Sequence, residues 1–421
     1  MNTITKQIVD RIDSTKGTPD FLDVLFGRHK QEALEGAPVV LFGAGGLGEE
    51  LCATLKTHGV LPFCFCDNNA SRKGSLYHGL PVITFQELLT SHRESLIVIA
   101  SHKYMGPMTQ QLLDNGFNKD RVLCKSSDTL SPIVFMYAMI GTQGLLSNYQ
   151  IQCRGRTILE VLLEHEQSLS DAYSLLADEH SKGLFIAKLA LMASNGNFEL
   201  FKHFILTYSQ PVLEFGFGNY EGTPEDYFYF NNDVITLAPD EVYVDVGAYD
   251  GDTVDTFIKA CHRFGVRYKR IHAFEPDPAC YQALVKNTAG YENVLCYQTG
   301  VWSHTQVLRF TSSGIAMHDQ AGTIDRTGDI EINVVHLDDF LQDEAVSFIK
   351  MDPGGNVIPE AIQGAAEIIA RYKPKLALGA YHGLESIFEI PILVHRICPA
   401  YRLYLRHNTY HLCDTDMFAV I

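Results

Sequence analysis

Short apolar runs alternate with amphipathic stretches between residues 38 and 130. The runs PVVLF, LPFCFC and SLIVIA have the length and the β-branched and aromatic content of buried strands. The stretches GEELCATLKTHG and MTQQLLDNGF place apolar residues at helical spacing and end near a glycine, which commonly stops a helix. Alternation of strand and helix is typical of a parallel sheet covered by helices. Residues 38–130 are therefore predicted to form a Rossmann-like three-layer αβα domain.

The same alternation returns from residue 236 to the C-terminus and predicts a second Rossmann-like αβα domain over residues 236–421. VLRFTSS and IEINVV read as an inserted hairpin that leads into the helix HLDDFL. EAIQGAAEIIARY reads as a helix after the fourth core strand. The core strands expected here are VYVDV, RIHAF, NVLCY, VSFIKMD, KPKLALGAYH, RLYLRHN and TDMFAVI.

Two further stretches are helical in pattern. Residues 1–37 predict an N-terminal helical segment that is interrupted by a turn at Gly17–Pro19. Residues 131–235 are expected to form a helical connector that packs the two sheets against each other. The length of 421 residues fits several domains, because single hydrophobic cores stop growing at about 250–300 residues.

The charge balance narrows the class of partner. The chain has a formal net charge of −17, which argues against nucleic acid and against anionic membranes. No apolar run is long enough to span a membrane, and the first residues lack the apolar stretch of a secretion signal. The cysteines are scattered, and Cys64 and Cys66 lie in a strand pattern without a metal set, so we expect buried free thiols in a cytoplasmic protein.

A first glycine loop follows the strand VVLF. Its glycines allow a sharp turn, a close approach to a ligand and close packing of the next helix. Asp67 ends the next strand, where a carboxylate could accept ribose hydroxyls. The loop is equally explained as a structural turn, and Glu49 and Glu50 would weaken its attraction for phosphate. The glycines concerned are Gly43, Gly45, Gly46 and Gly48.

This front domain resembles the nucleotide-binding domains that precede sugar acyltransferases and similar polysaccharide enzymes. The matching text is VVLFGAGGLGEEL followed by FCDNNASRKGSLYHGLPVITFQEL. The resemblance implies a nucleotide or nucleotide-sugar pocket without identifying the ligand.

A second glycine loop follows the strand that ends at Val246. Asp245, Asp250 and Asp252 crowd this turn, so a pyrophosphate would meet like charges, whereas S-adenosylmethionine carries cationic groups and no phosphate. Glu275 ends the next strand and can accept both ribose hydroxyls. The acids at the start of the helix could alternatively serve only the helix N-terminus. The residues expected to bind the cofactor here are Asp245, Gly247, Tyr249, Asp250, Gly251, Thr253, Glu275, Pro276 and Asp277.

The adenine is expected beyond the third strand of this domain. In doubly wound folds ligands lie outside the carboxyl ends of the strands, so Gln298, Thr299 and Gly300 are predicted to line the adenine pocket. Trp302, the only tryptophan, is more readily explained as a core residue than as an adenine platform.

The successive motifs DVGAYDGDT, FEPDP, LDDFL, FIKMD and KPKLALGAYH resemble those of FkbM-family methyltransferases, from about residue 225 to the end. The resemblance implies a seven-stranded methyltransferase sheet with its last strand antiparallel. It also implies O-methylation, commonly of a sugar or secondary-metabolite hydroxyl. One departure stands out: after FIKMD the family usually has aliphatic-Glu-Gly-small-Glu, whereas this chain has Pro353, Gly354, Gly355, Asn356 and Val357.

The loss of both acids leaves several explanations open. The substrate differs, catalysis is weak, the domain only binds, or the loop never touches the chemistry. A base is expected near the methyl group, and His382 and Asp352 are the candidates because they end adjacent strands on the cofactor side. Each also has a structural explanation, His382 as a core histidine and Asp352 as a cap of the glycine turn. By the alternation of side chains along a strand, Lys350 is expected to point the opposite way from the last residues of its strand and to be structural.

No metal site is predicted, because His304, His318, His336 and His407 show no ligand spacing. Three functions remain: an S-adenosylmethionine-dependent O-methyltransferase acting on a small molecule or glycan, a cofactor-binding protein with weak or regulatory activity, and an NAD-dependent oxidoreductase using the front loop. The sequence identifies neither the acceptor nor the oligomeric state.

Overall fold

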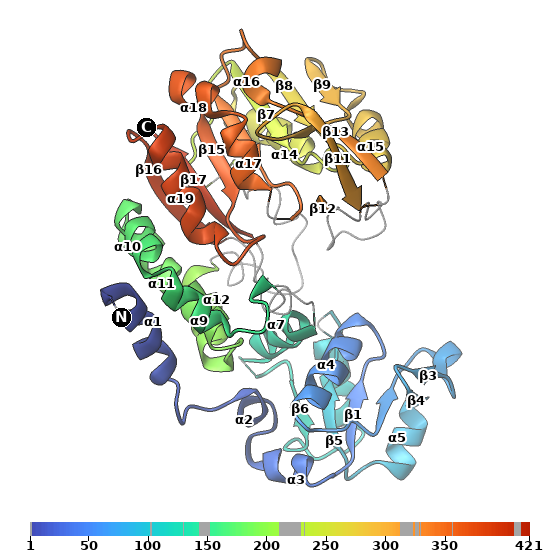
Figure 1. Cartoon of the computed structure of the whole chain (residues 1–421). Coiled ribbons are helices and arrows are strands. Elements are labelled where there is room, and N and C mark those ends of the chain that lie inside the picture. The colour runs from blue at the N-terminus through green and yellow to red at the C-terminus, as the bar shows by residue number, and fades with distance from the viewer. Residues whose placement is uncertain are drawn as a thin grey trace. The chain divides into compact units, whose positions relative to one another are not determined.

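The computed structural model describes residues 2–101, 103–128, 130–142, 152–209, 229–230, 232–311, 323–324, 328, 330–355, 357–407 and 414–421. The chain forms two compact units. The first contains residues Asp10–Ile151 and Ala190–Tyr220, and the second contains Met1–Val9, Gln152–Leu189 and Glu221–Ile421. Figure 1 shows the elements of both along the chain.

The first unit is built on a six-stranded sheet in the order β3-β4-β2-β1-β5-β6. All pairs are parallel except β3 with β4. Every residue of β1 and β5 is buried, as continuous apolar runs in a parallel sheet should be. The predicted strands and helices are therefore present. They are β1 (Val39–Phe42), α4 (Gly46–Thr57), β2 (Cys64–Cys66), β3 (Leu76–Tyr77), β4 (Leu80–Ile83), α5 (Phe85–Ser91), β5 (Leu96–Ile99), α6 (Met105–Asp114) and β6 (Val122–Leu123).

The first residues of the chain are helical, as predicted, and the interruption lies where glycine and proline indicated it. Asp20 caps the second helix: its side chain accepts a hydrogen bond from Asp23 N, and the Asp23 side chain accepts one from Asp20 N. The elements are α1 (Thr3–Asp13), α2 (Phe21–Phe26), η1 (Gly27–His29) and α3 (Lys30–Leu34).

The described part of the predicted helical connector is mostly helical. The two compact units divide this stretch between them, with α7 and α12 in the first and α9 and α10 in the second. In the second unit α10 packs against α19. The role of residues 131–235 as a connector stays a prediction. The helices are α7 (Ser131–Thr142), α9 (Ile158–Glu164), α10 (Glu166–Leu175), α11 (Glu179–Ala193) and α12 (Phe198–Tyr208).

The second unit contains a seven-stranded sheet in the order β16-β17-β15-β14-β7-β8-β9. The strand β17 is antiparallel to both of its neighbours, and the other pairs are parallel. This confirms the predicted mixed α/β fold, with the last strand antiparallel. The strands are β7 (Glu241–Val246), β8 (Tyr268–Phe274), β9 (Val294–Tyr297), β14 (Phe348–Met351), β15 (Lys375–Gly379), β16 (Arg402–His407) and β17 (Thr415–Val420).

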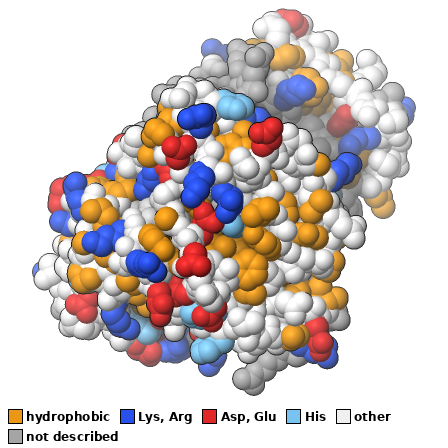
Figure 2. Space-filling view, turned by 90° about the horizontal axis from the view of Figure 1, so that it is seen from above, with side chains coloured by type: hydrophobic (Ala, Val, Ile, Leu, Met, Phe, Trp, Pro, Cys, Tyr) orange, Lys and Arg blue, Asp and Glu red, His pale blue; other side chains and the backbone are white. Residues whose placement is uncertain are grey.

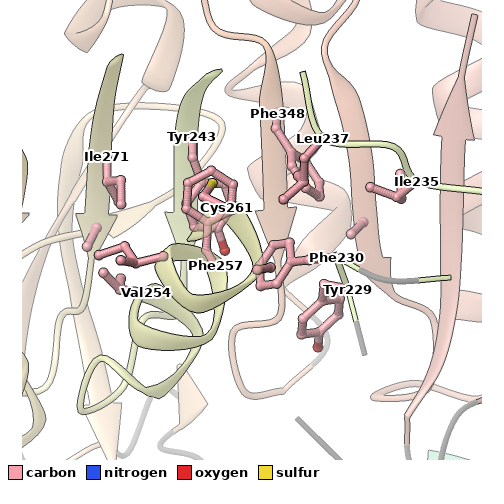
Figure 3. Close-up of a cluster of buried hydrophobic side chains, with 14 of the residues drawn as sticks. Tyr229, Phe230, Ile235, Leu237, Tyr243, Val254, Phe257, Cys261, Ile271 and Phe348 are labelled. Atoms are coloured by element: carbon pink, nitrogen blue, oxygen red, sulfur yellow. The ribbon is translucent and has the colours of Figure 1, made fainter. Parts of the chain in front are cut away.

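Aromatic side chains form much of the core on one face of this sheet (Figure 3). The rings of Tyr243 and Phe257 stack with centroids 4.3 Å apart, and Phe230 meets both edge-on. Each such side chain contributes roughly 1.5–3 kcal/mol by burial, so this face of the sheet is firmly held. The helices of the unit are α14 (Asp252–Phe264), α15 (Pro278–Thr288), α16 (Leu337–Phe340), α17 (Ile358–Gln363), α18 (Ala366–Tyr372) and α19 (Ser386–Ile397).

The predicted hairpin forms a sheet of its own. Strands β11 (Gln306–Thr311) and β13 (Ile330–Val335) pair antiparallel, with β10 (Gly300–Val301) and β12 (Thr323–Ile324) beside them. Trp302 packs against the apolar cluster of this sheet, which favours its interpretation as a core residue. The helix expected over 360–372 is instead two helices, α17 and α18, with Gly364 between them. A Cβ at Gly364 would lie 2.1 Å from the carbonyl oxygen of Trp302, so the close contact there requires glycine.

In the described part of the chain, no helix is long and apolar enough to cross a membrane, and no group of His, Cys, Asp and Glu could hold a metal ion. The described cysteines are free, and burial raises the pKa of Cys64 to about 12. On the face seen in Figure 2, Lys and Arg side chains are interspersed with Asp and Glu.

Candidate functional site

The strand order of the second sheet reverses beside β7. The chain moves from β7 to β8 and β9 on one side, and then returns to β14 on the other. Ligands of doubly wound folds bind at such a switch point, outside the carboxyl ends of the strands. Gly247 shows how closely the two strand ends approach: it has a φ of +78°, and a Cβ there would lie 2.8 Å from the carbonyl oxygen of Asp352 and from Cα of Pro353. The loop after Asp352 therefore borders the glycine turn.

Glu275 ties the second glycine turn to the end of β8. Its Oε2 accepts a hydrogen bond from Tyr249 N at 3.0 Å, and its Oε1 accepts one from Asp277 N at 2.8 Å. Burial raises the pKa of Glu275 to about 7, although the two backbone N–H groups act in the opposite direction. A carboxylate offers about four acceptor positions, so two remain for a ligand. Tyr249 itself has a φ of +47°, and Gly251 at +94° starts α14.

Asp245 and Lys350 form a buried ion pair beneath the same turn. Lys350 Nζ lies 3.1 Å from Asp245 Oδ1 and donates to the carbonyl oxygen of Gly247 at 2.9 Å. Thr253 donates to the other carboxylate oxygen of Asp245. Burial lowers the pKa of Lys350, but the charges of Asp245 and Asp352 outweigh it and raise the pKa above its usual range. Asp245 and Thr253 thus hold the turn in place.

The expectation that Lys350 points away from Asp352 is wrong. Residues two apart in a strand project from the same face, so Lys350 and Asp352 share one. Lys350 donates to the carbonyl oxygen of Gly247, and Gly247 also lies against the backbone of Asp352.

Two other predicted cofactor residues accept hydrogen bonds from nearby backbone N–H groups. Asp277 caps α15 by accepting from Ala279 N at 2.8 Å, which is a structural role. The half-buried Asp250 accepts from Asp252 N at 3.3 Å.

The residues expected around the adenine lie next to the end of β8. Thr299 is buried and donates to the carbonyl oxygen of Asn333 at 2.9 Å, whereas Gln298 is exposed. A Cβ on Gly300 would lie 3.7 Å from Cγ of Pro276. The structure therefore brings Gly300 beside Pro276, two residues that sequence reasoning assigned to one ligand from separate motifs.

His382 and Asp352, the two candidate bases, are hydrogen-bonded to each other. Nε2 of His382 lies 2.7 Å from Oδ1 of Asp352, while Oδ2 accepts from the hydroxyls of Tyr229 and Tyr381, each at 3.0 Å. Burial raises the pKa of Asp352, but the hydrogen bond and positive charge of His382, the charge of Lys350 and the hydrogen bond from Tyr229 outweigh it, so that the pKa is about 2. The carboxylate is thus held ionised.

Four residues around this carboxylate were missed by sequence reasoning: Tyr229, Tyr381, Gly379 and Asp416. A Cβ on Gly379 would lie 2.4 Å from Oδ1 of Asp352, so this glycine leaves room for the carboxylate. Asp416 pairs with Gly379 across β15 and β17, is fully buried, and has no hydrogen-bond partner for either oxygen among the described residues. Burial and the charge of Asp352 raise the pKa of Asp416 well above its usual range. Its one available signal was an acid inside the apolar run TDMFAVI.

Among the described residues, the three histidines that were set aside as metal ligands each lie beside a different side chain. His407 is buried with Nδ1 2.9 Å from the Thr415 hydroxyl, and His336 lies 3.6 Å from Asp339. His304 lies 3.0 Å from the Ser303 hydroxyl, while His318, like Asn356 of the unusual loop, lies outside the described residues.

The first glycine loop lies at the carboxyl edge of the other sheet, beside a cavity of about 490 Å³. Asp67 accepts from Ala44 N at 2.9 Å with Oδ2 and from Asn69 N at 2.7 Å with Oδ1. It therefore joins the loop after β1 to the loop after β2. Of the four glycines of the loop, Gly43 and Gly45 line the cavity.

One family model matches part of the second unit. Residues 245–412 match the model of the methyltransferase FkbM domain. No curated protein matches the chain. The methyltransferase FkbM of Methylobacillus flagellatus KT shares the fold, with a TM-score of 0.59 and 19% identity over 99% of both chains.

Two other solved structures have much lower TM-scores. Precorrin-6y C5,15-methyltransferase of Geobacter metallireducens GS-15 has a TM-score of 0.28 and 14% identity over 47% of this chain and 94% of its own. Fibrillarin of Aeropyrum pernix, solved with natively bound S-adenosyl-L-methionine, has a TM-score of 0.27 and 9% identity over 44% of this chain and 67% of its own.

Proposed function

We propose that residues 245–412, which form a methyltransferase FkbM domain, transfer a methyl group from S-adenosylmethionine to a hydroxyl oxygen of a sugar or another small molecule. One observation carries the proposal beyond the family match. The half-buried Asp352–His382 pair, 2.7 Å between Oδ1 and Nε2, lies at the edge where the acidic glycine turn of β7 meets the end of β14. This places a proton acceptor beside a turn suited to a cationic donor.

The residues of the turn fit S-adenosylmethionine in charge and in hydrogen-bonding capacity. The donor supplies the methyl group on a sulfonium cation. Asp250 and the ionised form of Glu275 give the turn acidic surroundings that favour cations over phosphates, while the charge of Asp245 is compensated by Lys350. The two acceptor positions left on Glu275 suit a pair of ribose hydroxyls.

His382 is the base in this proposal, and Asp352 positions it. A carboxyl with a pKa of about 2 is a weak proton acceptor at neutral pH. The ionised carboxylate of Asp352 accepts a hydrogen bond at Nε2 of His382 and so favours the tautomer with its proton on Nε2. This tautomer has a lone pair on Nδ1 of His382. That nitrogen can take the proton from an acceptor hydroxyl. The Tyr229 and Tyr381 hydroxyls fix the carboxylate from its other oxygen.

The loop after Asp352 favours a second candidate, a protein that binds the donor and turns over slowly. Pro353 and its neighbours stand where the resembling family has two acids, and Pro353 lies against Gly247 of the donor turn. A loop in this place contacts bound ligands in doubly wound folds. Loss of its acids therefore bears on the acceptor or on the rate, while the donor contacts at Glu275 are untouched.

Calorimetry with S-adenosylhomocysteine on the full chain tests donor binding, with Glu275→Ala as the damaged variant and Asp67→Ala as the control in the first unit. We expect binding by the wild type and Asp67→Ala, and at least tenfold weaker binding by Glu275→Ala. Methyl transfer to a panel of sugars, nucleotide sugars and hydroxylated metabolites then separates the two candidates. Absence of donor binding contradicts both, and binding without transfer favours the second.

A further inference from the structure

The cavity of the first unit is built like a ligand site independently of the methyltransferase. It lies where the sheet order turns back, because β1 pairs with β2 on one side and with β5 on the other. Its volume of about 490 Å³ falls in the range of small-molecule sites. Residues that follow all three strands line it, including Gly45, Asp67, Asn68, Arg72, Ser101 and Tyr104.

Two of the four glycines beside this cavity are required by the chain's own packing. Gly43 has a φ of +125°, and a Cβ there would lie 2.6 Å from the carbonyl oxygen of Ala100. A Cβ on Gly48 would lie 2.1 Å from the carbonyl oxygen of Gly43. Any larger residue at either position would displace backbone, so these glycines need no ligand to explain them.

The other two glycines have no such explanation. A Cβ on Gly45 or Gly46 would meet nothing within 4 Å. Gly45 has a φ of −115°, which any residue adopts, and Gly46 is the first residue of α4. Of these two glycines Gly45 lines the cavity, so the space that it keeps free is available to a bound molecule.

Arg72 and the N–H groups at the start of α4 favour an anionic group in the cavity, although the Asp67 carboxylate also lines it. The sequence suggested that Glu49 and Glu50 would repel phosphate, but Glu49 lies 3.1 Å from Nε2 of His78, and neither acid lines the cavity. Arg72 does line it, with its guanidinium 5.4 Å from the Tyr77 ring centroid. Within the described residues Arg72 forms no ion pair, and the N–H groups of Gly45, Gly46 and Leu47 donate to no backbone carbonyl.

The rest of the lining suits a nucleoside. Tyr104 presents a half-exposed ring, and Pro107 and Met108 continue the apolar wall. Asn68 and Asp67 supply polar atoms at the end of β2. Asp67 already accepts one backbone N–H at each oxygen and so keeps acceptor positions for hydroxyl groups.

We infer that the cavity binds a nucleoside diphosphate or a conjugate of one. Its phosphates lie on the loop of Gly45 and Gly46 beside Arg72, its ribose faces Asp67, and its base rests on the wall of Tyr104 and Met108. The inference does not rest on the methyltransferase proposal, because every residue in it belongs to the first unit.

Calorimetry on the full chain with UDP, ADP, GDP, CDP, their nucleosides, pyrophosphate and NAD tests it. We expect one nucleoside diphosphate to bind at micromolar concentration, at least tenfold tighter than its nucleoside, pyrophosphate or NAD. Gly45→Ser should weaken that binding at least tenfold, because its hydroxyl would take the free N–H groups and fill the phosphate space. Arg72→Met should weaken it similarly, while binding of S-adenosylhomocysteine stays within twofold in both variants.

Three results would overturn the inference: no diphosphate binding, binding that survives both variants, or binding that is lost in Glu275→Ala and retained in Gly45→Ser. Gly45→Ser is expected to fold, since nothing lies within 4 Å of its Cβ, and serine is a good N-cap. The melting temperature of each variant checks this directly.

Discussion

Nε2 of His382 lies 2.7 Å from Oδ1 of Asp352, although the two residues end different strands of the second sheet. In the proposed reaction the two residues have different roles. The half-buried, ionised carboxylate of Asp352 orients and polarises the ring of His382, and Nδ1 of that ring is left to accept a proton. The carboxylate also has four neighbours that only the folded chain brings together: Tyr229, Tyr381, Gly379 and Asp416.

Replacement of His382 by glutamine should abolish most methyl transfer while leaving the donor bound. General base catalysis contributes about 10²–10⁴-fold, so we expect the rate constant of transfer to fall by that range. Donor affinity, measured by calorimetry, should change less than threefold. His262→Gln on the exposed face of α14 serves as control. Equal rates for wild type and His382→Gln would remove the histidine from the chemistry.

Donor affinity should rise with pH through about 7. Burial raises the pKa of Glu275 to about 7, and the ionised carboxylate is the better acceptor for ribose hydroxyls. Below that pH the carboxyl is protonated and loses acceptor capacity, so binding weakens. Titration with S-adenosylhomocysteine between pH 5.5 and pH 8.5 measures the effect. Glu275→Gln should bind weakly with little dependence on pH, and a retained pH profile in that variant would assign the titration to another group.

Asp416→Asn should stabilise the protein at high pH. Because burial raises the folded-state pKa of Asp416, its contribution to stability is fully present below the unfolded pKa of about 3.9 and is lost as the pH rises. Asparagine keeps the shape and removes the titration. We expect a gain of about 1–3 kcal/mol in the free energy of unfolding at pH 8, shrinking towards pH 4.

Urea unfolding at both pH values measures this difference. The exposed Asp343→Asn provides the control, and it should show no comparable dependence. An equal loss of stability for Asp416→Asn at pH 4 and pH 8 would mean that the carboxylate has a partner which the described residues do not provide.

Gly379→Ala should damage the site through Asp352. The new Cβ would lie 2.4 Å from Oδ1 of Asp352, which must move away from His382. We expect at least a tenfold loss of transfer rate and about 1–3 kcal/mol of destabilisation, the usual cost of overpacking. Gly290→Ala is the matched control, because a Cβ there meets nothing within 4 Å. If both alanine variants kept full activity, close approach at Gly379 would not matter for the carboxylate.

Gly43→Ala and Gly45→Ala should separate structure from ligand binding in the first unit. Gly43 has a φ of +125° and a backbone oxygen 2.6 Å from the new Cβ, whereas Gly45 has neither restriction. We expect Gly43→Ala to lower the melting temperature clearly, and Gly45→Ala to cost no more than about 1 kcal/mol as an N-cap change. Thermal unfolding of both variants measures the difference, and equal melting temperatures would refute the distinction.

The sequence by itself determined the fold class and the edge of each sheet where ligands are expected. Apolar runs, helical spacing and glycine turns are local features of the sequence. They therefore predict the strands β7, β8, β14 and β15 and the acids at the ends of these strands. Because both strands are parallel, the strand-end rule predicts Asp352 and Glu275 at one edge of the sheet.

Only the tertiary structure decided which of these groups touch. The hydroxyl of Tyr229 reaches Asp352 across 123 positions of sequence, and Asp416 faces Gly379 through strand register. The packing of α4 likewise turned Glu49 towards His78. Contacts of this kind depend on how whole elements pack, which a local pattern of polar and apolar residues does not encode.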